Sequence, residues 1–227
     1  MSDVFELKLP ATSANLGPAF DAAGLAFNLG LRVRADVASG GEDTVTATGR
    51  DAAICGDARD HLILKVYRRL LERENRRAPA LALALDNAIP IGKGCGSSAA
   101  ARLAGVALAS HFGELDWDAQ RVFEEAAVLE GHPDNVAACW WGGLVVSRQS
   151  KDAIDWLRVP AAAAWPLLLA VPTAPLSTEE ARSVLPTQLS RADAVANLQN
   201  ALFFMQAWQQ GRGDLLAGAL DDLWHQP

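Results

Sequence analysis

The sequence has little of what marks secreted, zinc-binding or nucleic-acid-binding proteins. It holds 3 cysteines in 227 residues, Cys55, Cys95 and Cys139, and no two have CxxC spacing. An odd number of widely spaced cysteines argues against a disulfide framework or a zinc site and favours a reducing cytoplasm. The formal net charge is −7, and no basic run is present. Because binding to a nucleic-acid backbone needs clustered Lys and Arg, we expect no nucleic-acid partner.

Long apolar segments are also lacking. The N-terminal stretch MSDVFELKLPATSANLG has no basic region followed by an apolar run, so no signal peptide is expected. The apolar run AAAAWPLLLAV is too short to span a bilayer and contains a proline, which favours a buried strand. We therefore expect a cytoplasmic protein with no membrane partner.

The composition is that of a folded protein, with 50 % hydrophobic and 21 % charged residues. A chain of 227 residues is long for one domain and comfortable for two. The polar stretch SRQSKDAID, beginning at Ser147, is the best linker candidate, and it divides the chain into domains 1–150 and 151–227. An acidic protein can still bind phosphate locally, through backbone N–H groups and a metal ion.

Alternating and helical patterns give the expected elements. Strands are predicted over 4–9, 31–37, 43–49, 81–89 and 142–147, with SGGED as the turn of a hairpin between the second and third. Helices are predicted over 62–75, capped by Asp60, and over 98–112, 118–130, 190–211 and 213–224. LRVP and WPLLLAV read as further strands, and Ser177 with Glu180 forms a capping box. The second domain then has few strands for its helices to cover, so its apolar surface needs a further C-terminal piece or a second copy in a homodimer.

One glycine-rich loop suggests an anion site. IPIGKGCGSSAAARLAG begins at Ile89 and joins a strand to a helix of small residues. Backbone N–H groups at a helix N-terminus attract phosphate, and Gly92, Gly94 and Gly96 allow it to approach closely. The string is neither a Walker A loop nor a dinucleotide-binding GxGxxG. Taken alone, it favours phosphate only slightly over a tightly packed turn.

Two polar stretches strengthen the case for a site. PATSANLGPAFDAAGLA carries Asn15 and Asp21, and LEGHPDNVAACWWGG places four polar side chains within six positions. Each residue has a structural alternative, because Asn15 and Asp21 could be turn formers and His132 a hydrogen-bonded core residue. Polar groups so dense between apolar flanks are nevertheless hard to explain as solvated surface.

These segments together resemble the signature of the GHMP kinases, and within that superfamily they are most similar to the homoserine kinases. PATSANLGPAFDAAGLA resembles the substrate segment and IPIGKGCGSSAAA the phosphate loop, while EGHPDNVAACWWGG and STEEARSVLP resemble the next two characteristic stretches. The resemblance implies a two-lobed α+β fold. Its N-terminal lobe would be like ribosomal protein S5 domain 2, and its C-terminal lobe ferredoxin-like and here truncated.

The resemblance also implies a nucleotide site with ATP and Mg²⁺. The residues implied to bind ATP are His61, beside the purine, and the loop residues Pro90, Ile91, Gly92, Lys93, Gly94, Cys95, Gly96, Ser97 and Ser98. Lys93 is expected to face outward. The implied metal site consists of Ser98, Glu130 and Thr178, the last of which is also expected near the γ-phosphate. A hydroxyl and a carboxylate leave room for the waters and phosphate oxygens that Mg²⁺ prefers.

The implied reaction is the ATP-dependent phosphorylation of the side-chain hydroxyl of L-homoserine to O-phosphohomoserine, in threonine biosynthesis. The implied substrate-binding residues are Asn15, Asp21, His132, Asn135 and Arg182, and the implied catalytic residues are Asp21, Asp134, Asn135 and Lys93. Physically, Asp21 suits the substrate ammonium or hydroxyl, and Arg182 suits its carboxylate. Asp134 is either a base or a partner for His132. Phosphoryl transfer depends chiefly on positioning and charge neutralisation, so it does not require a strong base.

The sequence departs from the family pattern at several positions. Cys95 replaces a leucine in the loop, Ala19 replaces the second glycine of GPGFD, and His61 replaces an asparagine. We expect Cys95 to be a small packed side chain rather than a nucleophile. The family's third, glycine-rich motif would lie beyond Pro227.

Two other functions stay open from the sequence. One is another GHMP small-molecule kinase, such as a mevalonate kinase, which would not need both Asp21 and Arg182. The other is an incomplete, catalytically silent chain that binds nucleotide or serves as a partner module.

Overall fold

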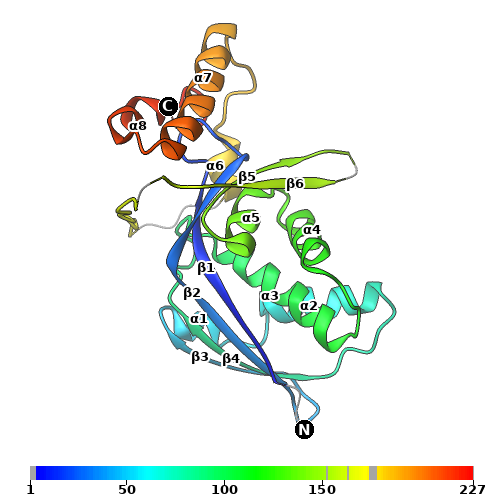
Figure 1. Ribbon diagram of the computed structural model, residues 1–227. Helices are drawn as coiled ribbons and strands as arrows, with labels where there is room; N and C mark the ends of the chain where they lie inside the picture. The colour runs from blue at the N-terminus through cyan, green and yellow to red at the C-terminus, as the bar shows by residue number, and fades with distance from the viewer. Residues whose placement is uncertain (1–3, 152, 163, 174–177, 227) are drawn as a thin grey trace.

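The computed structural model describes residues 4–226 except 152, 163 and 174–177 (Figure 1). The strands are β1 (Phe5–Ala14), β2 (Ala23–Val37), β3 (Thr44–Gly49), β4 (Leu81–Asn87), β5 (Leu144–Gln149) and β6 (Ile154–Val159). The helices are α1 (Ala52–Cys55), α2 (Leu62–Arg73), α3 (Ser97–Phe112), α4 (Ala119–Glu130), α5 (Asp134–Trp141), α6 (Thr178–Ser183), α7 (Arg191–Gln209) and α8 (Gly213–Ala219). Among the helices in this part of the chain, none is both long enough and apolar enough to cross a membrane.

One mixed sheet organises the fold, and the long strand β2 is its centre. β1 pairs antiparallel along one edge of β2, while β4 and β5 pair antiparallel with the two ends of its other edge. The path of the sheet is β3-β4-β2-β5-β6, with β1 beside β2. β2 is therefore hydrogen-bonded along both edges, as expected of a strand in the middle of a sheet.

The predicted hairpin between 31–37 and 43–49 is wrong. β3 pairs parallel with β4, and β4 lies between β3 and β2. Since both edges of β2 are taken by other strands, β3 has no place beside it. Asp43 helps to fix the new arrangement, because its carboxylate accepts a hydrogen bond from the backbone N–H of Leu81, at 2.9 Å.

Helices α2, α3, α4 and α5 cover one face of the sheet and enclose the main core (Figure 1). β4 alternates as predicted, with Leu81, Leu83 and Leu85 buried. The small residues of α3 let the helix lie close to its neighbours. A Cβ added at Gly105 would lie 2.6 Å from the Cβ of Val66 on α2, well inside van der Waals contact.

Two details of the helices differ from the predictions. α2 begins at Leu62 with His61 at the N-cap position and no side-chain cap, so the predicted cap by Asp60 is wrong. Asp60 forms an ion pair with Lys65 instead. The helix α5 also lies where the sequence patterns predict none. Asp134 lies in the first turn of α5, where its negative charge interacts favourably with the positive end of the helix dipole.

The chain after β5 differs most from the predictions. The stretch predicted to link two domains is wrong as a linker, because β5 and β6 form an antiparallel pair within the main sheet. The predicted strand WPLLLAV is irregular and mostly exposed, with Leu168 at 96 % exposure. Its residues pair with no strand in the described part of the chain. The division into domains 1–150 and 151–227 stays a prediction.

The C-terminal helices pack against the end of the sheet through a small second core. It includes Leu25, Leu144 and Val159 from the strands and Phe204 and Trp208 from α7. Leu198, Leu202 and Phe203 of α7 are more than half exposed, which agrees with the apolar surface expected there. The homodimer or further C-terminal piece expected to cover it stays a prediction. Ser177 of the predicted capping box lies outside the described residues.

Candidate active site

The glycine-rich loop leaves β4 and ends at the N-terminus of α3. Buried Asn87 fixes its start, since its Nδ2 donates to the carbonyl of Ile89, at 2.9 Å, and its Oδ1 accepts from the N–H of Ile89, at 3.0 Å. Gly96 stands at the N-cap position with a φ of 71°, and no side chain of the described residues caps the helix. The first N–H groups of a 16-residue helix are therefore available to an anion.

Cys95 is buried within this loop. The residue is 3 % exposed, and its thiol donates to the carbonyl of Lys93 at 3.5 Å. Burial raises the pKa of the Cys95 thiol. A buried thiol with a raised pKa is a weak nucleophile. Lys93 extends from the same loop, and its Nζ donates to the carbonyl of Thr173.

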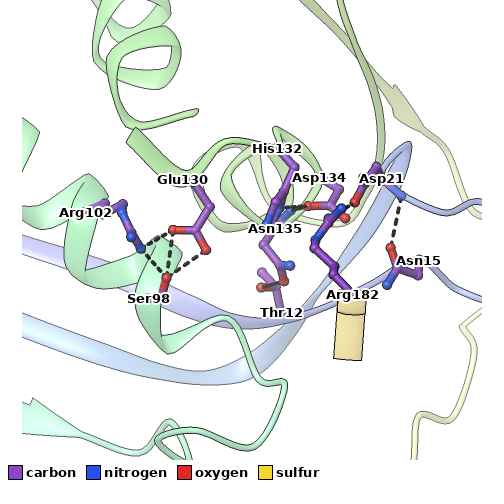
Figure 2. A network of polar contacts seen from close by, with 10 residues as sticks. All are labelled: Thr12, Asn15, Asp21, Ser98, Arg102, Glu130, His132, Asp134, Asn135 and Arg182. Carbon is purple, nitrogen blue, oxygen red and sulfur yellow. Dashed lines mark hydrogen bonds and ion pairs between the residues drawn. The ribbon is translucent and has the colours of Figure 1, made fainter. Parts of the chain in front are cut away.

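Ser98, Glu130 and Arg102 form a compact cluster beside the start of α3 (Figure 2). Ser98 Oγ lies 2.7 Å from each carboxylate oxygen of Glu130, the last residue of α4. Arg102 Nη1 donates to both Ser98 Oγ and Glu130 Oε2. The Glu130 side chain is only 11 % exposed, so water screens these interactions poorly.

Asp21 and Arg182 form a direct ion pair in the same region (Figure 2). Arg182 Nη2 donates to Asp21 Oδ1, and the guanidinium lies 5.1 Å from the ring centroid of Phe20. Asn15 holds the Asp21 backbone, because its Oδ1 accepts from the N–H of Asp21 at 3.0 Å. Asn15 and Asp21 both have positive φ, 70° and 55°. Asn15 and Asp21 are therefore turn residues and also line the second cavity described below.

His132, Asp134 and Asn135 form a second polar chain at the start of α5. His132 Nδ1 lies 3.0 Å from Asp134 Oδ1, which also accepts from the N–H of Asn135 at 2.6 Å. Asn135 Oδ1 in turn accepts a 2.7 Å hydrogen bond from Thr12 Oγ1 of β1. Asp134 is 1 % exposed, so its place in this structure is that of a buried partner of His132. Its predicted role as a base stays untested.

Two cavities meet at the glycine-rich loop. The first, of about 550 Å³, is lined mainly by apolar residues, including Leu31, Ile63 and Ile89, and by His61. The second, of about 450 Å³, is lined by the charged and polar residues described above. Gly92, Ser97 and Ser98 line both cavities. An apolar cavity, a glycine-rich loop that ends at an uncapped helix start, and a charged pocket thus follow one another in space.

His61 belongs to the first cavity. Its Nε2 lies 3.0 Å from the carbonyl oxygen of Cys55, to which it can donate. Desolvation lowers the pKa of His61, which favours the neutral ring at physiological pH. Its Nδ1 is buried and has no hydrogen-bond partner among the described residues.

Comparisons with known proteins decide the family. Residues 61–143 match the sequence model of the GHMP kinases N terminal domain. The chain is 41 % identical to a homoserine kinase of Solibacter usitatus over 224 residues, which cover 98 % of this chain and 73 % of that protein. The chain belongs to the homoserine kinase family. It is therefore a kinase, a phosphotransferase with a hydroxyl group as acceptor.

Further relatives agree with this family. A homoserine kinase of Deinococcus radiodurans is 36 % identical to this chain. The matched region covers 98 % of this chain and 72 % of that protein. The crystal structure of a Cytophaga hutchinsonii homoserine kinase matches all of this chain and 74 % of its own, with a TM-score of 0.76 and 27 % identity. A Streptococcus pneumoniae phosphomevalonate kinase, 11 % identical with a TM-score of 0.65, shares the fold. The match covers 97 % of this chain and 77 % of that kinase. The predicted GHMP kinase fold and family are confirmed.

The structure of this homoserine kinase family member brings most of the predicted site residues together. The second cavity is lined by Asn15, Asp21, Lys93, Ser98, Glu130, His132, Asp134, Asn135 and Arg182, and His61 lines the first. The side chain of Thr178 lies outside the described residues. The individual roles of all these residues stay predictions.

Two residues beside the site were not predicted. Arg102 follows Ser98 by four positions and so shares its helix face. Its sequence signal is that of a single arginine in a helix made mostly of small side chains. Thr12 has no such signal, because a threonine in a strand is ordinary.

The stability of this kinase should depend on the protonation of His132. The hydrogen bond to Asp134 is the main cause that raises the pKa of His132, so the folded state favours the charged ring. The resulting stabilisation is complete below the ordinary histidine pKa of about 6.5 and disappears as pH rises through the raised pKa of the folded state. The quantity to follow is the free energy of unfolding of the wild type minus that of His132→Gln. We expect this difference to fall as pH rises from about 6.5 through the raised pKa of His132. Urea unfolding from pH 5.5 to 9 measures it, and a flat difference would contradict the charged pair.

Proposed function

We propose that the chain transfers the γ-phosphoryl group of ATP to the side-chain hydroxyl of L-homoserine, giving O-phosphohomoserine, a step toward threonine. The observation that carries this proposal is the meeting of the two cavities at Gly92, Ser97 and Ser98. A nucleoside suits the apolar cavity, and an amino acid with both charges suits the other. A cytoplasmic location, favoured by the unpaired cysteines, is part of the proposal.

The nucleotide would lie with its base in the first cavity and its phosphates along the loop. The apolar lining of Leu31, Ile63 and Ile89 suits the flat face of a purine. His61, with its lowered pKa, would meet the base as a neutral ring. The three phosphates would then reach the free N–H groups at the start of α3.

Ser98 and Glu130 would hold Mg²⁺. The donor set fits this ion, because one hydroxyl and one carboxylate within 2.7 Å of each other are hard oxygen ligands that leave other positions open. The ion would supply charge neutralisation at the phosphate oxygens. Thr178, at the start of α6, is the third predicted member of this set. Asp21, His132 and Asp134 also place ligand atoms within 4.8 Å of one another, but the Arg182 guanidinium already pairs with Asp21 there.

The second cavity would bind homoserine through opposite charges. Asp21 would pair with its ammonium group, and Arg182 with its carboxylate. Because these two side chains pair with each other in the structure, a zwitterionic ligand can replace both halves of the existing pair. His132 and Asn135 would position the hydroxyl side of the ligand. In the structure His132 is hydrogen-bonded to Asp134, and Asn135 to Thr12. Lys93 would add positive charge on the loop side of the pocket.

A substrate panel tests the proposal. ADP release is measured with homoserine, mevalonate and shikimate, with Ser98→Ala as the blank. We expect turnover with homoserine alone. Turnover of mevalonate without homoserine would favour another kinase of the superfamily. Absence of turnover with any acceptor, together with retained nucleotide binding, would favour a silent chain.

Replacing Arg182 by alanine should affect the acceptor site alone. Loss of a charge-assisted contact to the substrate carboxylate should raise KM for homoserine roughly 10- to 100-fold. KM for ATP should stay within about twofold, because Arg182 lines only the second cavity. Arg191→Ala, at an exposed arginine at the start of α7, is the matched control. Equal rises in both KM values would contradict the assignment.

A further inference from the structure

Arg102 contacts both residues that are proposed to hold the divalent cation, Ser98 and Glu130. It is the only arginine, lysine or acidic residue of α3. Because it follows Ser98 by four residues, the two side chains lie on the same helix face. Figure 2 shows its guanidinium directed at Ser98 and Glu130, and Nη1 donates to both of them.

The contacts of this cluster use the atoms that a metal would need. Ser98 Oγ donates to the Glu130 carboxylate and accepts from Arg102, while Glu130 Oε2 accepts from Arg102 as well. The Arg102 and Glu130 side chains are 25 % and 11 % exposed, so their charges attract each other more strongly than on an open surface. A cation arriving alone must break this pair before it can bind.

We infer that Arg102 is a resident cation of the metal site, which keeps Ser98 and Glu130 paired until a metal–nucleotide complex displaces it. This inference rests on the proposed assignment of Ser98 and Glu130 to the metal. A free metal ion offers the displaced guanidinium no new partner. A metal bound to a triphosphate brings phosphate oxygens, which accept hydrogen bonds from arginine readily. Metal and nucleotide therefore enter together, and the metal alone binds weakly.

A purely structural role for Arg102 makes a different prediction. If the arginine only joined α3 to α4, its removal would lower stability and leave metal binding unchanged. If it competes with the metal, its removal leaves a largely buried carboxylate and a hydroxyl free to bind a cation. Metal affinity without nucleotide therefore separates the two roles.

The test is titration of the full chain with Mn²⁺, whose free concentration is read by electron paramagnetic resonance in the absence of nucleotide. Relative to the wild type, Arg102→Leu should bind Mn²⁺ more tightly by on the order of tenfold or more, because one positive charge has left the site. Adding Glu130→Gln to Arg102→Leu should abolish the gain. Arg121→Leu is the matched control, because Arg121 is also a helical arginine beside a buried glutamate, 2.5 Å from Glu125. Equal Mn²⁺ affinities of Arg102→Leu and the wild type would overturn the inference, as would an equal gain in Arg121→Leu.

Thermal unfolding gives a second measurement, because Arg102→Leu can lower stability. Mn²⁺ should raise the Tm of Arg102→Leu and leave that of the wild type unchanged without nucleotide.

A parallel titration of Mn²⁺ with a non-hydrolysable ATP analogue present tests the underlying assignment of Ser98 and Glu130 to the metal. If Glu130→Gln weakens Mn²⁺ binding there, the metal site stands and the first titration judges Arg102 alone. If it does not, the assignment of the metal site itself fails.

Discussion

Glu130→Gln is expected to lower kcat for homoserine phosphorylation by roughly 10²- to 10³-fold, the usual cost of removing one electrostatic stabiliser of a transition state. The substitution keeps the shape of the side chain and removes its negative charge. Ser98 then has a neutral amide beside it in place of the carboxylate that lies 2.7 Å away. Because a neutral amide holds Mg²⁺ poorly, the phosphates of bound ATP would lose their charge partner. The measurement is ADP release at saturating ATP and homoserine.

Glu124→Gln is the matched control for this variant. Glu124 lies on the same helix, α4, and its Oε1 accepts from Gln120 Nε2 at 2.9 Å, away from both cavities. We expect its kcat to stay within about threefold of the wild type. A kcat for Glu130→Gln that also stays in that range, with an unchanged Tm, would remove Glu130 from the transfer step.

Gly96→Ala is expected to destabilise the fold by about 2–5 kcal/mol, the sum of left-handed backbone strain and overpacking. Gly96 has a φ of 71°, and a Cβ there would lie 1.9 Å from Thr12 Oγ1. Thr12 cannot give way easily, because it is fully buried and its Oγ1 donates to Asn135 Oδ1. The new methyl group must therefore move the loop, the strand or α5. Urea unfolding measures the free energy of unfolding.

Gly94→Ala separates the two causes. Gly94 has nearly the same φ, 69°, but an added Cβ would have no atom of the described residues within 4 Å. This variant carries only the backbone strain, so we expect a loss of about 1–2 kcal/mol. Equal losses in Gly94→Ala and Gly96→Ala would mean that the contact with Thr12 yields without cost.

The nucleotide half of the site could be predicted from the sequence because its signals are local. The alternating residues of Leu81–Asn87 and the glycines that follow them specify a strand, a turn and a helix start over fewer than 30 residues. The hairpin prediction failed because strand pairing is not local. Nothing within 43–49 indicates that a strand beginning at Leu81 will lie beside it.

The missed parts of the site have similar physical reasons. The Pro133–Asp134–Asn135 stretch has the composition of a turn, yet it starts α5, whose other face is buried against the sheet. Arg102 and Thr12 act through partners 28 and 123 positions away, Glu130 and Asn135. Such distances along the chain carry no pattern that a single sequence can reveal. The family resemblance supplied the roles of the other residues, because residue type and spacing alone left alternatives open.

The wall that the two cavities share bears on the kinetic order of the reaction. Gly92, Ser97 and Ser98 line both cavities, so in the proposed arrangement donor and acceptor would be bound at the same time and meet at these residues. No side chain then has to carry the phosphoryl group from one cavity to the other. Initial rates at several fixed acceptor concentrations should give reciprocal plots that intersect, whereas a phosphorylated enzyme intermediate gives parallel lines. The geometry of the wall thus favours a ternary complex over a double-displacement cycle.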